Sequence, residues 1–321
     1  MEKIANNPYA YIHGANYIPS YALCLNDVMD HYNEEIIARE LGWAHEVGFN
    51  SVRMWFSDTS YIRQPGTFLS QMEQILNILS AYDMTLMPTL FNRWVDPRFY
   101  FGQLDLTVAI GEVYDTKRKY IRDVVSAFGR DPRILMWDLC NEPFSYGWIY
   151  NTDDALLQQL YPREVRFWKQ CIEVFRDAAP SQPLTMGFMD PTDANIDEVC
   201  RLCDVISCHT YLGWTDDTMQ PRVEANIRYS NRLKKPLINT ETCQGSLDDA
   251  TRAICIERTL DVMRQAELGF YVWQLCSGEM VSARRDRTDP NCAPGDSAYM
   301  SFLQWNGKLR PKHEVVKKYL Q

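Results

Sequence analysis

The sequence predicts a single (β/α)8 barrel domain that spans residues 1–321. Eight short apolar runs alternate with longer amphipathic stretches, which is the pattern of βα units around a parallel sheet. No linker rich in Pro, Gly or Ser and no low-complexity tract divides the chain. Barrels of this length routinely form one domain, and the 46% of hydrophobic residues is ample for one core.

The predicted strands are apolar runs of four to six residues, each bounded by polar or turn-forming residues. Eight parallel strands can close on themselves, which removes both sheet edges and fills the interior with side chains. The strands are expected at His13–Ile18, Ser51–Phe56, Thr85–Leu90, Leu135–Cys140, Leu184–Phe188, Val205–His209, Leu237–Thr240 and Phe270–Leu275.

The predicted helices carry apolar residues three or four positions apart. Gly48 follows the first stripe as a C-terminal stop, and Lys312–Leu320 is expected to form the closing helix. The stripes are Ile37, Leu41 and Ala44; Leu69, Met72, Leu76 and Leu79; Val165, Trp168, Ile172 and Phe175; and Ile256, Leu260 and Met263.

A doubly wound open sheet is the alternative fold for such an alternation of strands and helices. That fold usually carries a Gly-rich turn after its first strand. Here the corresponding residues are His13-Gly14-Ala15-Asn16, which do not match G-x-G-x-x-G. The comparison favours the barrel.

The chain is acidic, with a formal net charge of -9 and a pI near 5.2. Such a surface repels phosphate backbones and anionic lipid, so we expect no nucleic acid and no membrane as partner. Residues 1–8 have no apolar core of a signal peptide, and no segment approaches the roughly 18 apolar residues of a membrane helix. We therefore expect a cytoplasmic protein, or a secreted one if a signal has been removed. The sequence makes no prediction of oligomeric state.

Several of the ten cysteines lie inside apolar strand-like runs, which suits a reducing compartment. Cys200-x-x-Cys203, followed by Cys208-His209, has the spacing of a zinc site. However, Cys208 and His209 are adjacent on a strand, so their side chains point to opposite sides. With only five histidines in the chain, we predict no metal and no cofactor.

A barrel places its catalytic side chains where the strands end, because the βα loops at that face build the site. The fourth strand leads into Asn141-Glu142-Pro143, and the seventh ends in Glu241. Two carboxyl groups about 5–5.5 Å apart perform retaining glycoside hydrolysis, whereas wider pairs leave room for a water and invert. One carboxyl must stay protonated while its neighbour stays ionised, and their mutual repulsion favours this.

The Asn141-Glu142-Pro143 triplet, Glu241, His209-x-Tyr211 and Trp273 together resemble glycoside hydrolase family 5 and related clan A barrels. The resemblance extends from His13 to about Gly278. The triplet alone is a weak signal, but its place at a fourth strand with a second Glu at the seventh is a strong one. The resemblance implies that Glu142 is the catalytic acid/base and Glu241 the nucleophile.

The same resemblance implies roles for the polar residues at other strand ends. Asn141 would form a hydrogen bond to the sugar 2-hydroxyl. Arg53 and Tyr211 would lie beside Glu241 and keep it ionised and oriented. His209 would lie near Glu142 or the sugar.

Trp273 would form the floor under the sugar ring in the -1 subsite, because a flat indole suits the apolar face of a pyranose. Four further tryptophans fall on predicted βα loops and are candidates for additional subsites. They are Trp55, Trp94, Trp148 and Trp214.

Two features depart from the family pattern. Families of this type often carry a His pair after strand three, where this chain has Phe91-Asn92-Arg93-Trp94. We expect Asn92 to make the sugar contact there, with Arg93 as the alternative. The charged segment Arg284–Asp289 after strand eight is not part of the pattern, and it is either a solvated lid edge or a contact for a distant or carboxylated sugar.

The sequence thus predicts a retaining glycosidase that acts by double displacement on β-gluco- or β-manno-configured oligosaccharides, from the chain end. The close alternative is an endo-acting mannanase or cellulase. A carbohydrate-binding barrel without catalysis is disfavoured because both Glu142 and Glu241 are present. A metal-dependent hydrolase is disfavoured by the scarcity of histidine.

Overall fold

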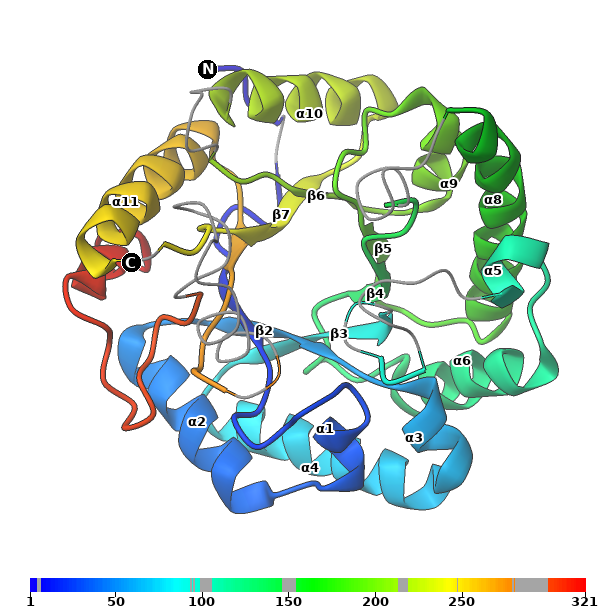
Figure 1. Ribbon diagram of the computed structural model, residues 1–321, viewed down its shortest axis with the longest axis horizontal. Coiled ribbons are helices and arrows are strands. Elements are labelled where there is room, and N and C mark those ends of the chain that lie inside the picture. Colours follow the sequence, from blue (N-terminus) through cyan, green and yellow to red (C-terminus); the bar gives the residue numbers. More distant parts are fainter. Residues whose placement is uncertain are drawn as a thin grey trace.

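The computed structural model describes residues 1–4, 7–92, 94, 96–98, 106–145, 154–212, 219–246, 248–278, 280 and 300–321. Eight parallel strands pair in the order β5-β4-β3-β2-β1-β8-β7-β6, and helices surround them (Figure 1). At the seam between β5 and β6, the backbone N–H groups of Asp204 and Val205 donate to the Leu184 carbonyl at 2.8 and 3.2 Å. The sheet is therefore a nearly closed barrel, and the predicted fold class is confirmed.

The strands are β1 (His13–Tyr17), β2 (Ser51–Trp55), β3 (Thr85–Phe91), β4 (Trp137–Asn141), β5 (Leu184–Gly187), β6 (Ile206–His209), β7 (Leu237–Thr242) and β8 (Phe270–Val272). The main differences from the prediction are that β4 begins two residues later and β8 ends three residues earlier. The bodies of all eight runs are strands. That the whole chain forms a single domain stays a prediction.

The helices of the described residues are α1 (Asp27–Asp30), α2 (Glu34–Val47), α3 (Asp58–Arg63), α4 (Pro65–Ala81), α5 (Leu106–Ile110), α6 (Asp115–Phe128), α8 (Asp154–Asp177), α9 (Asp197–Leu202), α10 (Met219–Leu233) and α11 (Asp249–Ala266), with the 3-10 helices η1 (Ala194–Ile196) and η2 (His313–Tyr319). Gly48 ends α2 at φ 113°, a left-handed conformation that glycine adopts easily. The expected closing helix is a 3-10 helix, in which the Val315 N–H donates to the Lys312 carbonyl three residues back.

The barrel interior has an apolar layer near the amino ends of the strands and a polar layer above it. Gly14 makes room for the lower layer, because a Cβ at this position would lie 2.3 Å from the Tyr271 ring. Arg53 and Asp138 belong to the polar layer, and both side chains are fully buried. The lower layer consists of Ile12, Met87, Met136, Val205, Ile238 and Tyr271.

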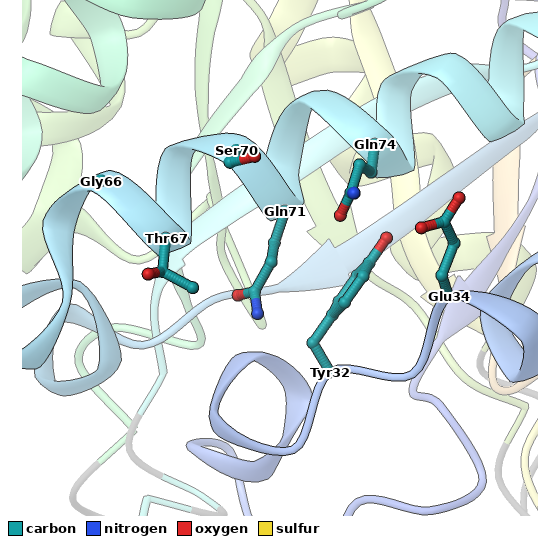
Figure 2. Close-up of a pocket in the computed structure, with 7 residues that line it drawn as sticks. All are labelled: Tyr32, Glu34, Gly66, Thr67, Ser70, Gln71 and Gln74. Carbon is teal, nitrogen blue, oxygen red and sulfur yellow. The ribbon is translucent and has the colours of Figure 1, made fainter.

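Other features of the described residues bear on the sequence-based expectations. Nine cysteines are free thiols, eight of them buried. No helix in the described ranges has both the length and the apolar character needed to cross a bilayer. An open groove of about 600 Å³ lies outside the barrel, between α4 and the segment around Tyr32 and Glu34, and its lining is mostly polar (Figure 2). None of its lining residues belongs to the strand-end cluster described next.

Candidate active site

Glu142 is the first residue after β4, at the carboxyl end of the barrel. Its backbone adopts a left-handed conformation with φ 48°, which L-residues rarely occupy. The Glu142 N–H donates to the Gly187 carbonyl at 2.8 Å, and this bond ties the turn to β5. The side chain is 12% exposed, so it borders on solvent while its backbone is held.

Glu241 lies within β7 and is almost completely buried. The β6–β7 register shifts between Cys208 and His209, so that His209 pairs with Glu241. This irregularity places the two side chains beside one another at the carboxyl end of adjacent strands.

The two carboxyl groups meet around His209. Its Nδ1 lies 2.8 Å from Glu142 Oε1 and 3.5 Å from Glu241 Oε2. The nearest nitrogen and oxygen atoms of these three side chains lie within 4.8 Å of one another. The acids predicted from strands four and seven therefore share one site.

Arg53 connects Glu241 to the polar layer of the barrel. Its Nη1 donates to Glu241 Oε1 at 2.7 Å and to Asn16 Oδ1 at 2.8 Å. Its Nε and Nη2 lie 2.8 and 2.7 Å from one oxygen of Asp138, and Nη2 also donates to Asn141 Oδ1 at 2.7 Å. A single guanidinium thus fixes groups from β1, β4 and β7, which its planar fork of five donors makes possible.

The second oxygen of Glu241 accepts a hydrogen bond from Tyr211. The phenol OH lies 2.9 Å from Glu241 Oε2, while Arg53 binds Oε1. Both oxygens therefore have strong donors, an arrangement that favours the carboxylate form.

Asn141 and Asn92 form an amide pair next to Glu142. Arg53 fixes the orientation of the Asn141 amide by donating to Oδ1, so Nδ2 faces Asn92 Oδ1 at 3.3 Å. Asn92 Oδ1 also accepts from the Trp94 N–H at 3.1 Å. Among the described residues, Asn92 Nδ2 has no hydrogen-bond partner, so it has a donor to offer to a ligand.

Burial and neighbouring charges shift the pKa values of these groups. Burial lowers the pKa of His209 to about 4, so the imidazole is neutral at neutral pH. Burial raises the pKa of Glu241, and the Arg53 charge opposes that rise. Burial, reinforced by the charges of Glu241 and Glu142, raises the pKa of Tyr211 well above its usual value, so Tyr211 remains a neutral donor.

Trp273 follows β8 and packs against Trp55, with ring centroids 5.0 Å apart. Its indole Nε1 lies 3.1 Å from the sulfur of Met300. Trp94, Trp273 and Trp55 are 8%, 6% and 4% exposed, so each of the three indoles presents only a small surface to a ligand. The structure places Trp273 and Trp55 together at the carboxyl ends of β8 and β2, and their roles as sugar platforms stay predictions.

Some of the predicted site residues lie outside the described residues. These are Arg93, Trp148, Trp214 and the segment Arg284–Asp289.

Sequence reasoning missed Asp138 and Asn16, which complete the contacts of Arg53. Asp138 had a recognisable signal, since it is a charged residue inside an apolar strand and opposite in sign to Arg53. Asn16 had no such signal, because its role depends on which strands are neighbours in the closed sheet.

Glu142, His209 and Glu241 are close enough to act as ligands of a cation. Arg53 and Tyr211 already use both oxygens of Glu241, and the guanidinium charge opposes a second cation there. In the part of the chain that the structure describes, Cys200 and Cys203 belong to no such group of three ligands.

Comparison with known proteins places the chain among carbohydrate-active barrels. A family model described as "Cellulase (glycosyl hydrolase family 5)" matches residues 22–279. Mannan endo-1,4-β-mannosidase A of Aspergillus aculeatus is 25% identical over 207 residues, which cover 55% of this chain and 54% of the relative. The chain thus spans about half the length of that curated relative.

Solved structures share the fold at low sequence identity. An exo-β-1,4-mannosidase of Opitutaceae bacterium strain TAV5 superposes with a TM-score of 0.74 at 15% identity, over 96% of this chain and 58% of the other. A family 5 protein of Streptomyces cattleya, solved in complex with GlcNAc, gives a TM-score of 0.71 at 14% identity, over 96% and 79% of the two chains. Since the family model matches most of the chain, and the observed barrel is the fold of these neighbours, the chain belongs to glycosyl hydrolase family 5.

Proposed function

We propose that the chain is a retaining β-glycoside hydrolase in which Glu142 is the acid/base and Glu241 the nucleophile. The observation that carries the proposal is the meeting of Glu142, His209 and Glu241, whose nearest polar atoms lie within 4.8 Å of one another. Carboxyl groups this close favour direct attack, because an inverting enzyme needs room for a water between them.

In the first step, a carboxylate oxygen of Glu241 attacks the anomeric carbon as the bond to the leaving oxygen breaks. Glu142 gives its proton to that oxygen, which leaves as an alcohol. In the second step, Glu142 takes a proton from water, and the resulting hydroxide displaces Glu241 from the anomeric carbon. Two displacements restore the original configuration.

The neighbours of each acid match these roles. Arg53 and Tyr211 donate to the two oxygens of Glu241, which stabilises the anion needed for attack. His209 has a pKa of about 4 and is neutral at neutral pH, so it adds no positive charge that would ionise Glu142. Glu142 borders on solvent and is therefore the group that a departing sugar and an incoming water reach.

The variants Glu142→Gln and Glu241→Gln test the assignment. Each should lose about 10²–10⁴-fold or more in turnover of an aryl β-glycoside, because a positioned proton donor or nucleophile has been removed. The first product released by the unaltered chain should be the β-anomer by NMR. Turnover near that of the unaltered chain in either variant, or an initial α-anomer, contradicts the proposal.

For the substrate, we propose β-1,4-linked manno-oligosaccharides cleaved from the chain end. One structural neighbour that aligns with 96% of this chain is named an exo-β-1,4-mannosidase, which supports this choice. Endo action on mannan is the second candidate, because the curated relative at 25% identity is named an endo-mannosidase. A β-gluco-configured substrate is the further alternative within the family described as cellulases.

Two assays separate these substrates. A screen of aryl β-mannoside, β-glucoside, β-xyloside and β-galactoside identifies the sugar, and the mannoside should be turned over fastest. Digestion of mannohexaose labelled at its reducing end should then yield labelled products that shorten one unit at a time. Early labelled products of mixed length would instead establish endo action.

A further inference from the structure

The turn that carries Glu142 holds two non-glycine residues in the left-handed region. Glu142 has φ 48° and Phe144 has φ 64°. Such conformations are unfavourable for residues with a side chain and persist only where the surroundings hold them. Contacts that hold this turn therefore decide where the Glu142 carboxyl points.

Within the residues that the structure describes, three hydrogen bonds hold the turn. The Glu142 N–H donates to the Gly187 carbonyl at 2.8 Å, and the Ser145 hydroxyl donates to the Glu142 carbonyl at 2.7 Å. The third comes from a helix of the outer layer, since the Phe144 N–H donates to Glu164 Oε1 at 3.0 Å. Glu164 lies on α8, twenty residues beyond Phe144 in the sequence.

Glu164 is an unusual residue for this place, because its side chain is a carboxyl group with no exposed surface. Burial of a polar side chain is costly unless hydrogen bonds compensate for the lost water. The same Oε1 also accepts from the Trp168 indole at 2.9 Å, one helical turn further along α8. One buried oxygen thus accepts from both the Phe144 N–H and the Trp168 indole, with no water to compete for it, so Glu164 anchors the Phe144 backbone.

We propose that Glu164 is a positioning residue for the acid/base. By holding the Phe144 N–H, it fixes the turn from Glu142 to Phe144 against α8 and keeps the Glu142 carboxyl within reach of the leaving oxygen. This inference rests on the proposed function, in which Glu142 is the proton donor. Loss of the anchor impairs proton donation specifically, because displacements near 1 Å greatly reduce the rate of a positioned reaction.

Leaving-group dependence separates impaired proton donation from a general loss of folding. A 2,4-dinitrophenolate leaves without protonation, whereas the alcohol of an oligosaccharide needs a proton donor. For Glu164→Ala, kcat/KM on the oligosaccharide should fall about 100-fold, and kcat/KM on the matching dinitrophenyl β-glycoside should fall less than about 5-fold. If hydrolysis of the glycosyl-enzyme has slowed in the variant, azide should restore turnover of the dinitrophenyl substrate, because azide attacks the anomeric carbon without needing a base.

Two more variants at the same position refine the test. Glu164→Gln keeps an oxygen acceptor for the Phe144 N–H. The split, meaning the loss of kcat/KM on the oligosaccharide divided by the loss on the dinitrophenyl substrate, should therefore be several-fold smaller for Glu164→Gln than for Glu164→Ala. Glu164→Asp keeps the carboxyl group but withdraws its oxygens by one methylene, so its activity should fall clearly more on the oligosaccharide than on the dinitrophenyl substrate. If the alanine variant does not fold, the aspartate variant decides the question.

Glu40 provides a matched control, because it is also a buried carboxylate on a helix that holds a strand-end segment. It lies on α2, is 1% exposed, and accepts from the Tyr17 hydroxyl at 2.9 Å and the Ser20 N–H at 3.2 Å. No proposed catalytic acid lies on that segment. Glu40→Ala should therefore reduce activity on both substrates by the same factor, through stability alone.

The results distinguish this inference from the function on which it rests. Glu142→Ala should show the largest split between the substrates. If it shows none, the acid/base assignment is wrong, and the positioning role of Glu164 is wrong as well. If Glu142→Ala shows the split but the folded Glu164 variants lose both substrates equally, as Glu40→Ala does, only the positioning role is overturned.

Discussion

Arg53 Nη1 lies 2.7 Å from Glu241 Oε1 inside the barrel, where the Arg53 side chain has no exposed surface. Burial alone would lower the pKa of Arg53, but the charges of Asp138 and Glu241 outweigh it and the pKa is raised. The guanidinium is therefore a permanent positive charge between Asp138, which lies in the polar layer, and Glu241, the proposed nucleophile.

Arg53→Lys should lose about 100-fold in kcat and about 3–5 kcal/mol in the free energy of unfolding, because one ammonium cannot replace a planar fork and leaves buried carboxylates poorly paired. Steady-state kinetics and urea unfolding measure the two effects. Arg133→Lys is the control, since Arg133 is 22% exposed and pairs with Glu73 and Asp131 on the surface, where ion pairs contribute about 0–1 kcal/mol. Equal behaviour of the two variants contradicts the prediction.

Tyr211→Phe removes the OH that lies 2.9 Å from Glu241 Oε2. A hydrogen bond to a charged group is worth about 1.5–3 kcal/mol, which corresponds to roughly 10- to 100-fold in kcat. Tyr229→Phe loses a similar 2.9 Å bond to Asp197 in the helical layer and should leave kcat unchanged. An unchanged kcat in Tyr211→Phe would show that the Tyr211 hydroxyl does not contribute to catalysis.

Arg252 is a fully buried residue of α11 that holds the segment around Trp273. It donates to the Trp273 carbonyl at 3.0 Å and also to the carbonyls of Met300 and Ser301. A lysine at position 252 cannot reach all three carbonyls, so kcat/KM of Arg252→Lys should fall about 10-fold or more if Trp273 is the predicted sugar platform, because the Trp273 ring shifts. Arg310→Lys disturbs the 2.8 Å bond to Asp249 on the same helix and should leave kcat/KM within about 2-fold.

Stability should decrease in mild acid because the fold holds the pKa of His209 at about 4, below the ordinary value of 6.5. Between these values the unfolded chain binds more protons, so the His209 contribution is complete above about pH 6.5 and is lost as the pH falls toward 4. At about 1.36 kcal/mol per pH unit, the loss is on the order of 3 kcal/mol.

The variant His209→Asn cannot titrate in this range, so its urea midpoint should change less between pH 6.5 and pH 4 than that of the unaltered chain. His313, whose pKa burial lowers to about 3, remains in both proteins and contributes equally to each. Identical pH dependence in the two proteins would show that His209 is not held neutral.

Chelation should leave activity unchanged. Although Glu142, His209 and Glu241 are close together, both oxygens of Glu241 already accept hydrogen bonds from Arg53 and Tyr211. Dialysis against EDTA followed by assay of an aryl glycoside checks this. Activity that is lost with EDTA and restored by a divalent cation would contradict the expectation.

The sequence by itself determined the strand order along the chain and the acids at the strand ends. Apolar runs must be buried, and the polar residues that follow them must lie at the carboxyl face of a parallel barrel. Glu142 and Glu241 could therefore be selected from many carboxylates, since each closes such a run.

Only the tertiary structure decided which groups surround those acids. The contacts of Arg53 with Asn16, Asp138 and Glu241 depend on closure of the sheet, and the meeting of His209 with Glu241 depends on a register shift between β6 and β7. Glu164 reaches the Glu142 turn because α8 packs beside it. Local sequence patterns report burial and periodicity, whereas these contacts are set by curvature and packing between distant segments.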